Sequence, residues 1–167
     1  MKKIFITVVY ILFFWAILPF LLLSSSFFLD RKKELGFQGS AAKLFTGAAV
    51  AVFSFVMLLL SVFQFSKGAC KLPISALPPY DKLVSTGVYA LWRHPIYLFY
   101  TTLFGGIGLA AGSGGMIFVI LPLFALVVVI HALIEEFFLL RKHGEVYRQY
   151  QRSTGLLIPK RKKSSDQ

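Results

Sequence analysis

The sequence predicts an all-α integral membrane protein with about four transmembrane helices and a cytoplasmic amphipathic helix near the C-terminus. Three observations carry this prediction. Of the 167 residues, 57% are hydrophobic, and the mean hydropathy is +0.73. The apolar residues form long runs, which an ordinary soluble domain of this size does not need. Eighteen Lys and Arg residues against seven Asp and Glu give a net charge of +11.

Four apolar runs are the predicted membrane spans. They lie roughly at 4–29, 44–65, 96–111 and 116–138. A crossing helix takes about 20 residues, with about 17 as the lower limit, so the third run is short and borrows part of the glycine turn at 112–115. The first run follows two lysines, as a signal peptide does. It exceeds the usual apolar core of about 7–15 residues and no small-residue cleavage site follows it, so we expect a retained helix.

The distribution of Lys and Arg predicts that both termini lie in the cytoplasm. With four spans, 14 of the 18 positive residues share the side of the termini and of the loop between the second and third runs. The other four are Arg31, Lys32, Lys33 and Lys43, partly offset by Asp30 and Glu34. Topology and attraction to lipid headgroups explain the net charge better than nucleic-acid binding does. We expect an inner or cytoplasmic membrane protein.

The chain is too short for a separate soluble domain, so we expect one domain over 1–167. The lone cysteine, Cys70, excludes an internal disulfide and is expected to be inert. The prolines of the segment 70–80 predict an extended connector between the second and third spans. The expected parts are 1–66 with two spans, 81–159 with the polar residues described next, and a basic tail at 160–167.

Two polar clusters stand at the ends of the third and fourth runs, and ionisable groups at a membrane edge by default suggest a site. The first is 87–97, with the motif Arg93-His94-Pro95 and Tyr97. The second is 131–136, with His131, Glu135 and Glu136, followed by Leu139, Gly144, Tyr147 and Tyr150.

The two clusters are expected to meet on the cytoplasmic face. The glycine turn makes the third and fourth spans an antiparallel helical hairpin, and Pro95 suits the first turn of a helix. His131 and Glu135 share a helix face, whereas Glu136 is rotated off it. The predicted pocket, walled by Tyr89, Trp92, Tyr97 and Tyr147, would admit a water-soluble cofactor from the cytoplasm and a lipid-like substrate from the bilayer. A bend at Gly144 would lay the following helix along the headgroups.

Each feature alone also has a simpler interpretation. Arg93 alone is typical of an interfacial anchor, His94 of a helix cap, and the two glutamates of a helix leaving the membrane. The glycines at 105–112 indicate close helix packing rather than a phosphate loop. The spacing of the histidines and glutamates matches no standard metal motif, so we expect no metal.

Taken together, the clusters resemble the isoprenylcysteine carboxyl methyltransferase family and its relatives, the membrane phospholipid methyltransferases. The resemblance covers about 81–159, roughly the C-terminal half. The matching positions are Leu83, Val84, Gly87, Tyr89, Arg93, His94, Pro95, Tyr97, Glu135, Glu136, Leu139, Gly144, Tyr147, Tyr150 and Pro159. It implies a helical membrane enzyme that transfers a methyl group from S-adenosylmethionine to a lipidic or small hydrophobic acceptor.

The resemblance also implies which residues form the site. The cofactor shell would be Asp81, Lys82, Leu83, Val84, Tyr89, His94, Pro95, Ile96, Tyr97 and Glu135. His131, Arg93 and Glu136 are the expected catalytic residues, with Arg93 or His131 positioning an anionic acceptor or His131 acting as a base.

The chain departs from the family pattern at four positions. Phe99 stands where a glycine is common, Asp81 where a histidine is, and His143 where an aromatic residue is. His131 replaces an arginine that faces the substrate, and a histidine cannot grip a carboxylate bidentately. The acceptor therefore stays open between a prenylcysteine-like carboxylate, a phospholipid amine and a thiol. Functions of other classes are a membrane reductase that uses NADPH and a non-catalytic scaffold.

Overall fold

The computed structural model describes residues 12–37, 40–69 and 82–160, and within these ranges the chain is helical without strands. The predicted all-α class is confirmed. The segments are η1 (Phe13–Ile17), α2 (Leu18–Lys33), α3 (Ala41–Ala69), η2 (Gly87–Ala90), α4 (Pro95–Ala111), η3 (Gly115–Ile120), α5 (Leu121–His143) and α6 (Glu145–Ser153). Two continuous helices, Ala41–Ala69 and Gly115–His143, are long and apolar enough to cross a membrane, and Pro95–Ala111 is apolar but shorter. Cys70, the connector prolines and Asp81 lie outside the described residues.

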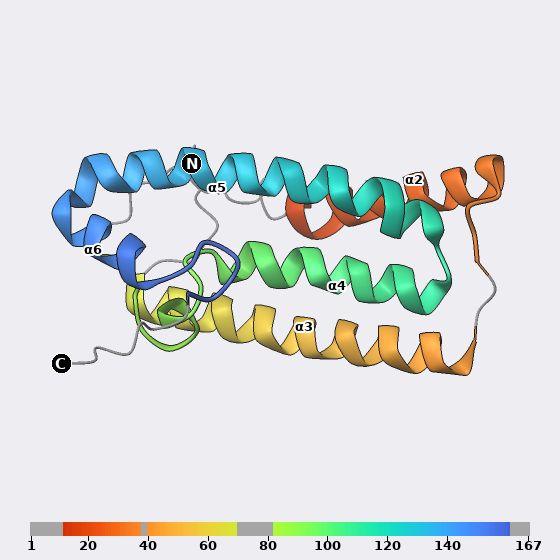
Figure 1. Ribbon diagram of the computed structural model, residues 1–167, viewed down its shortest axis with the longest axis horizontal. Coiled ribbons are helices and arrows are strands. Elements are labelled where there is room, and N and C mark those ends of the chain that lie inside the picture. Colours follow the sequence, from red (N-terminus) through yellow and green to blue (C-terminus); the bar gives the residue numbers. More distant parts are fainter. Residues whose placement is uncertain (1–11, 38–39, 70–81, 161–167) are drawn as a thin grey trace.

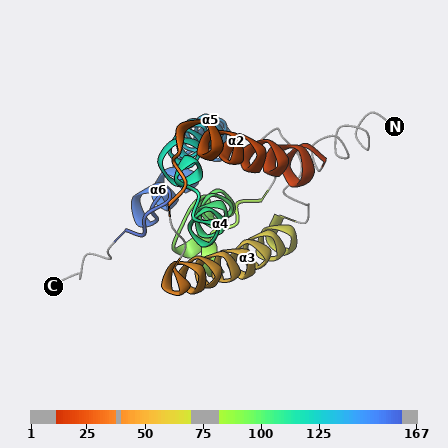
Figure 2. The same cartoon turned by 90° about the vertical axis from the view of Figure 1, so that its right-hand side faces the viewer.

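Three helices, α3, α4 and α5, run along the long axis of the molecule (Figure 1). Viewed along that axis, α4 lies between α3 on one side and α5 with α2 on the other (Figure 2). Helix α2 packs against η3 at one end, whereas α6 folds back from α5 at the opposite end. The central position of α4 means that both of its long faces are covered by other helices.

The π-helical segments η1 and η3 each come just before a proline. Pro19 and Pro122 occupy the first turn of the α-helices that follow. Proline lacks an N–H, and its ring clashes with the carbonyl four residues earlier. The wider π-helical turn before each proline moves that carbonyl away and so relieves the clash. The chain thereby passes through both prolines without breaking the helix.

Helices α3 and α4 approach closely through glycines. A Cβ atom on Gly106 would lie 2.6 Å from the backbone nitrogen of Ala51 and 2.8 Å from the carbonyl oxygen of Gly47. Near the middle of the pair, the hydroxyl groups of Ser54 and Thr102 lie 2.9 Å apart and share a hydrogen bond. The backbones therefore meet almost directly, as small residues allow in membrane helices.

A three-residue turn joins α4 to η3 and produces the expected antiparallel hairpin. Gly112 ends α4 in the left-handed conformation, with φ 67°, and its N–H bonds back into the last turn. The carboxylate of Asp30 accepts a 2.7 Å hydrogen bond from the backbone N–H of Gly115. Asp30 thus caps the start of η3 from α2 and ties the first described helix to the hairpin.

The chain bends sharply at Gly144, as expected. This residue has φ 56° and separates α5 from α6. After α6 the chain crosses back to the start of α4, where Gly155 pairs with Trp92 in an isolated parallel bridge. The backbone N–H of Arg93 donates a 2.8 Å hydrogen bond to the carbonyl of Gly155. The end of the described chain is therefore docked against the entrance of the hairpin.

Candidate active site

The two predicted polar clusters meet around His94. Its Nδ1 lies 3.5 Å from Oε2 of Glu135, and its Nε2 lies 3.4 Å from Oε1 of Glu136. His94 and Glu136 are buried, with 7% and 6% of their surface exposed. One imidazole thus stands between two carboxylates carried by consecutive residues of α5.

The sequence around Pro95 explains where His94 points. The ring of Pro95 disfavours helical backbone in the preceding residue, and His94 has φ −124° and ψ 61°. His94 therefore lies just outside α4, and its backbone N–H donates to the carbonyl of Leu156 at 3.3 Å. Proline at the start of the helix and the docked C-terminal segment fix the imidazole from both sides.

Arg93 is held by an extensive set of partners. Its Nε donates a 2.5 Å hydrogen bond to Glu136, and its Nη1 donates to the carbonyls of Gln151, at 3.1 Å, and Thr154. Gln151 also donates from Nε2 to the other oxygen of Glu136, at 2.8 Å. The guanidinium therefore links α5 to the end of α6 and to the residue that follows it. A buried ion pair of this kind is costly to break because one charge would remain unpaired.

Charge balance in the cluster favours a protonated His94. Burial alone would lower the pKa of His94, but hydrogen bonding and charge attraction from Glu135 and Glu136 outweigh burial and raise the pKa above 6.5. With Arg93 and His94 positive and both glutamates negative, the cluster carries no net charge. A neutral set of paired charges can persist in a site that excludes most water.

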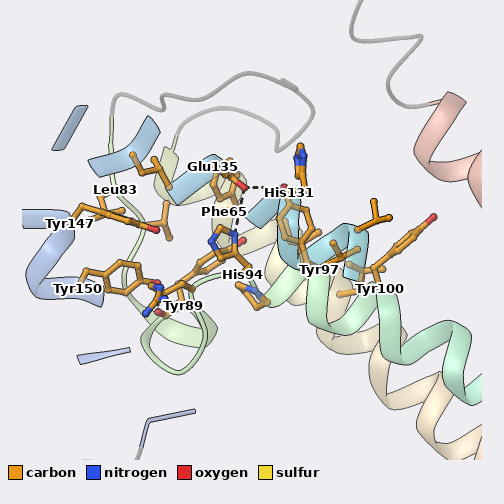
Figure 3. A pocket seen from close by; sticks show the side chains of 18 of the residues that line it. Phe65, Leu83, Tyr89, His94, Tyr97, Tyr100, His131, Glu135, Tyr147 and Tyr150 are labelled. Atoms are coloured by element: carbon orange, nitrogen blue, oxygen red, sulfur yellow. Dashed lines mark hydrogen bonds and ion pairs between the residues drawn. The ribbon is translucent and has the colours of Figure 1, made fainter. Parts of the chain in front are cut away.

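Tyr97 and His131 extend the cluster along the helices, toward Tyr100 (Figure 3). The hydroxyl of Tyr97 donates a 2.9 Å hydrogen bond to Glu135, and its ring stacks on His94 at 5.4 Å with the planes 4° apart. His131 meets the Tyr97 ring edge-on at 5.6 Å, with its own side chain exposed. His131 and Glu135 share a helix face, in agreement with their spacing of four.

A cavity of about 440 Å³ connects this cluster to the apolar interior. The polar half holds the charged groups together with aromatic and apolar side chains, and the lining of the apolar half is aliphatic and aromatic. The polar half is lined by Phe65, Lys82, Leu83, Val84, Tyr89, Arg93, His94, Pro95, Tyr97, His131, Glu135, Leu139, Tyr147 and Tyr150. The apolar half is lined by Phe13, Trp15, Leu18, Leu58, Ile96, Tyr100, Phe124, Val127 and Val128.

Most residues expected in the cofactor shell line this cavity. They are Lys82, Leu83, Val84, Tyr89, His94, Pro95, Ile96, Tyr97 and Glu135, and the tenth, Asp81, lies outside the described residues. Of the expected catalytic residues, Arg93 and His131 also line the cavity. Glu136 contacts Arg93 and Gln151 behind it instead.

The structure differs from the sequence expectations in two ways. Trp92, expected in the pocket wall, packs against Phe99 with ring centroids 5.3 Å apart and is not among the cavity-lining residues. Conversely, Gln151 and Thr154 were not predicted to take part. Both lie downstream of the polar clusters, and only the docking of the C-terminal segment brings them to Arg93.

A buried charged cluster that opens into an apolar cavity, between helices long enough to cross a bilayer, is typical of membrane enzymes that act on hydrophobic substrates. The phospholipid methyltransferase family model matches residues 42–146, from the start of α3 to the start of α6, and includes both polar clusters. The chain belongs to this family and is a membrane methyltransferase, so the predicted resemblance is confirmed. A comparison with curated proteins gave no significant match.

Proposed function

We propose that the protein transfers a methyl group from S-adenosylmethionine to the amine of a membrane lipid. The observation that carries this proposal is the continuous cavity that joins the His94–Glu135 pair to an apolar space between the helices. A water-soluble methyl donor and a lipid acceptor need such adjoining compartments. Membership of the phospholipid methyltransferase family supports both the reaction and the type of acceptor.

The polar half of the cavity suits the methyl donor. S-Adenosylmethionine carries an ammonium, a carboxylate and a sulfonium, and this half offers the Glu135 carboxylate, the Lys82 ammonium and several tyrosine rings. A carboxylate pairs with an ammonium, and aromatic faces attract a sulfonium cation. We assign His94 and Tyr97 to the orientation of Glu135, because both contact its carboxylate.

The cations of the cavity favour an amine over a carboxylate as acceptor. A carboxylate would need a free cation beside the apolar half. Of the lysines and arginines that line the described cavity, Arg93 is already bound to Glu136 and two carbonyls, and Lys82 belongs to the polar half. We therefore assign Arg93 and Glu136 to positioning the cluster rather than to gripping the acceptor.

We assign His131 the role of the base. It lines the cavity next to Tyr97, between the donor half and the apolar half. A lipid ammonium must lose its proton before attack, and a neutral imidazole can accept it, which a guanidinium cannot. The amine lone pair then forms the N–C bond to the methyl carbon. The C–S bond breaks, and its electron pair leaves on the thioether sulfur. Alignment in a water-poor site supplies most of the remaining acceleration.

We further propose four membrane crossings with the site and both termini in the cytoplasm. The Lys and Arg bias supports this orientation, since 14 of 18 positive residues would share that side. In the described part, Arg141, Lys142, Arg148, Arg152 and Lys160 belong to α5, α6 and the segment after them, at the end of the molecule that carries the site (Figure 1). The headgroup region of the inner leaflet would then lie at the polar half of the cavity.

The test is methyl transfer by purified protein in vesicles that contain phosphatidylethanolamine, with a radiolabelled methyl donor. We expect label in the lipid fraction rather than in protein or volatile products. His94→Ala and Glu135→Ala should each reduce the rate at least about 100-fold. Leu133→Ala is the matched control, because Leu133 lies on the exposed face of α5.

Other outcomes point to other functions. Label that stays with prenylated peptides would indicate a carboxylate acceptor, and label in volatile products a thiol. No transfer together with thermal stabilisation by NADPH would indicate a reductase. Alanine variants of the cluster that leave every measured property unchanged would favour a non-catalytic protein.

A further inference from the structure

Four basic residues gather at the end of the molecule opposite α6 and the candidate site (Figure 1). They are Arg31, Lys32 and Lys33 in the last turn of α2 and Lys43 in the first turn of α3, and all are exposed. In the proposed topology they stand on the side where Lys and Arg are scarce, so the charge bias does not explain them. The helix dipole favours cations at the end of α2 but disfavours Lys43 at the start of α3. The set therefore calls for a negatively charged partner.

The carboxylates at this end do not neutralise these charges. Asp30 accepts the backbone N–H of Gly115 at 2.7 Å. Within the described residues, neither Asp30 nor Glu34 forms an ion pair with any of the three basic residues of α2. At the other end of the molecule, by contrast, Arg148 lies 3.9 Å from a carboxylate oxygen of Glu145. The cations of α2 are therefore available to an external anion.

Three of the four cations lie over the ring of a phenylalanine. The pairs are Arg31 with Phe27 at 6.0 Å, Lys32 with Phe28 at 5.3 Å and Lys43 with Phe37 at 4.7 Å, each measured from the charged group to the ring centroid. Phe27 and Phe28 are 65% and 58% exposed, so on a membrane helix their rings face lipid chains. A cation over such a ring is held at the boundary between the chains and the headgroups.

The length of α3 places Lys43 at the same depth. At the other end of this helix, Lys67 lies over the ring of Phe63 at 5.8 Å. The rise from Lys43 to Lys67 is about 36 Å at about 1.5 Å per residue, against about 30 Å for the hydrocarbon core. Both lysines of a crossing α3 thus lie just outside the chains, at the level of the lipid phosphates. Phe37, the ring beneath Lys43, is fixed by a 2.9 Å hydrogen bond from its backbone N–H to the carbonyl of Gly112.

We propose that the end of α2 and the start of α3 bind the phosphate groups of anionic phospholipids in the leaflet opposite to the candidate site. Arg31, Lys32, Lys33 and Lys43 are the contacting residues. An anionic headgroup brings the net negative charge that these cations lack within the protein, whereas a zwitterionic headgroup neutralises its own phosphate. The proposal does not depend on the reaction, because it uses no residue of the candidate site.

The first experiment measures which lipid lies beside this surface. Phe28→Trp places a fluorescent reporter under Lys32, and the full chain is reconstituted in vesicles of phosphatidylcholine and phosphatidylglycerol in equal amounts. Brominated chains are carried by the phosphatidylglycerol in one set and by the phosphatidylcholine in the other, so only the quenching lipid differs. After subtraction of the wild-type signal, brominated phosphatidylglycerol should quench the reporter at least about twice as strongly. Equal quenching by the two lipids would overturn the inference.

The second experiment removes the charges in the Phe28→Trp protein. Arg31→Gln, Lys32→Gln and Lys33→Gln together should bring the quenching ratio to about 1, and Lys32→Gln alone should lower it part of the way. The single variant keeps the test valid should the triple variant not fold. The matched control, Arg141→Gln with Arg148→Gln and Arg152→Gln, removes three charges at the other end and should leave the ratio unchanged. An equal fall in the control would assign the preference to overall charge and overturn the inference.

A third arm separates lipid phosphate from free phosphate. The vesicles are prepared in sodium phosphate or in sodium chloride of equal ionic strength, so that screening is the same in both. The proposal expects the same quenching ratio in the two buffers. A ratio that falls to about 1 in phosphate alone would show that the surface takes the free anion, and the assignment to lipid would be wrong.

Discussion

The two faces of α4 have opposite roles, because one packs closely against a neighbouring helix and the other lines a cavity. On the face toward α3, Gly106 lets the helix backbones touch, and Ser54 bonds to Thr102. On the face toward α5, Tyr97 and Tyr100 project into a cavity. The difference shows how one short helix can pack tightly on one side and leave room for a ligand on the other. Small side chains remove the space between helices, while large aromatic side chains hold the next helix away and line the space that remains.

A large side chain introduced between α3 and α4 should have the largest effect on stability. In Gly106→Leu the new side chain would meet the backbone of Ala51 and Gly47, which cannot move aside as a side chain can. We expect destabilisation of more than about 3 kcal/mol, measured as loss of folded protein in thermal unfolding in detergent. Ala111→Leu adds a comparable side chain at an exposed position of α4 and should be tolerated. Equal stability of both variants would contradict the close contact.

On the cavity side, Arg93→Lys should cost about 2 to 3 kcal/mol. A lysine keeps the charge but cannot bond Glu136 and the carbonyls of Gln151 and Thr154 together. Chemical denaturation and limited proteolysis after residue 144 would measure the loss and locate it. Arg152→Lys is the control, because the Arg152 side chain is 73% exposed. A stable Arg93→Lys variant with an undigested C-terminal segment would refute the anchoring role.

The pH dependence of stability should report the protonation of His94, which lies between Glu135 and Glu136 on the cavity side of α4. Because the pKa of His94 is raised on folding, its protonation stabilises the fold below the unfolded value of 6.5, and this contribution is lost as pH rises through the higher folded pKa. Melting temperatures between about pH 6 and about pH 9 should therefore decline with pH. His94→Gln should flatten this decline, and an equally steep decline in that variant would assign it to other groups.

The smallest expected effect concerns the contact between α3 and α4. Ser54→Ala removes the interhelical hydrogen bond to Thr102 and should cost about 0.6 to 1 kcal/mol, since such bonds contribute modestly in membranes. A double-mutant cycle with Thr102→Val, read by thermal unfolding, would isolate the pair. A coupling energy near zero would mean that the glycine contacts alone hold the two helices together.

Local patterns in the sequence predicted much of this structure. The turn at Gly112, the bend at Gly144 and the shared face of His131 and Glu135 follow from short-range geometry, which a single chain reveals. The rotation of Glu136 away from that face follows in the same way.

Contacts distant in sequence were not predictable in this way. Nothing periodic links Thr154 or Gly155 to Arg93, because an isolated bridge leaves no repeating signal. The apolar half of the cavity was missed for a related reason: Leu58 and Phe124 are ordinary apolar residues, and only the packing of α3, α4 and α5 determines that they face an open space.

The docking of the C-terminal segment also sets an order for biosynthesis. Helices α3, α4 and α5 are all made before α6, but Arg93 finds its carbonyl partners only after Gln151 and Thr154 have been made. During translation the Arg93 guanidinium therefore lacks these two carbonyl partners, although α4 and α5 have already been made. A nascent chain stalled before residue 151 would lack the carbonyl partners of Arg93, so the site can be completed only after α6 and Thr154 have been made.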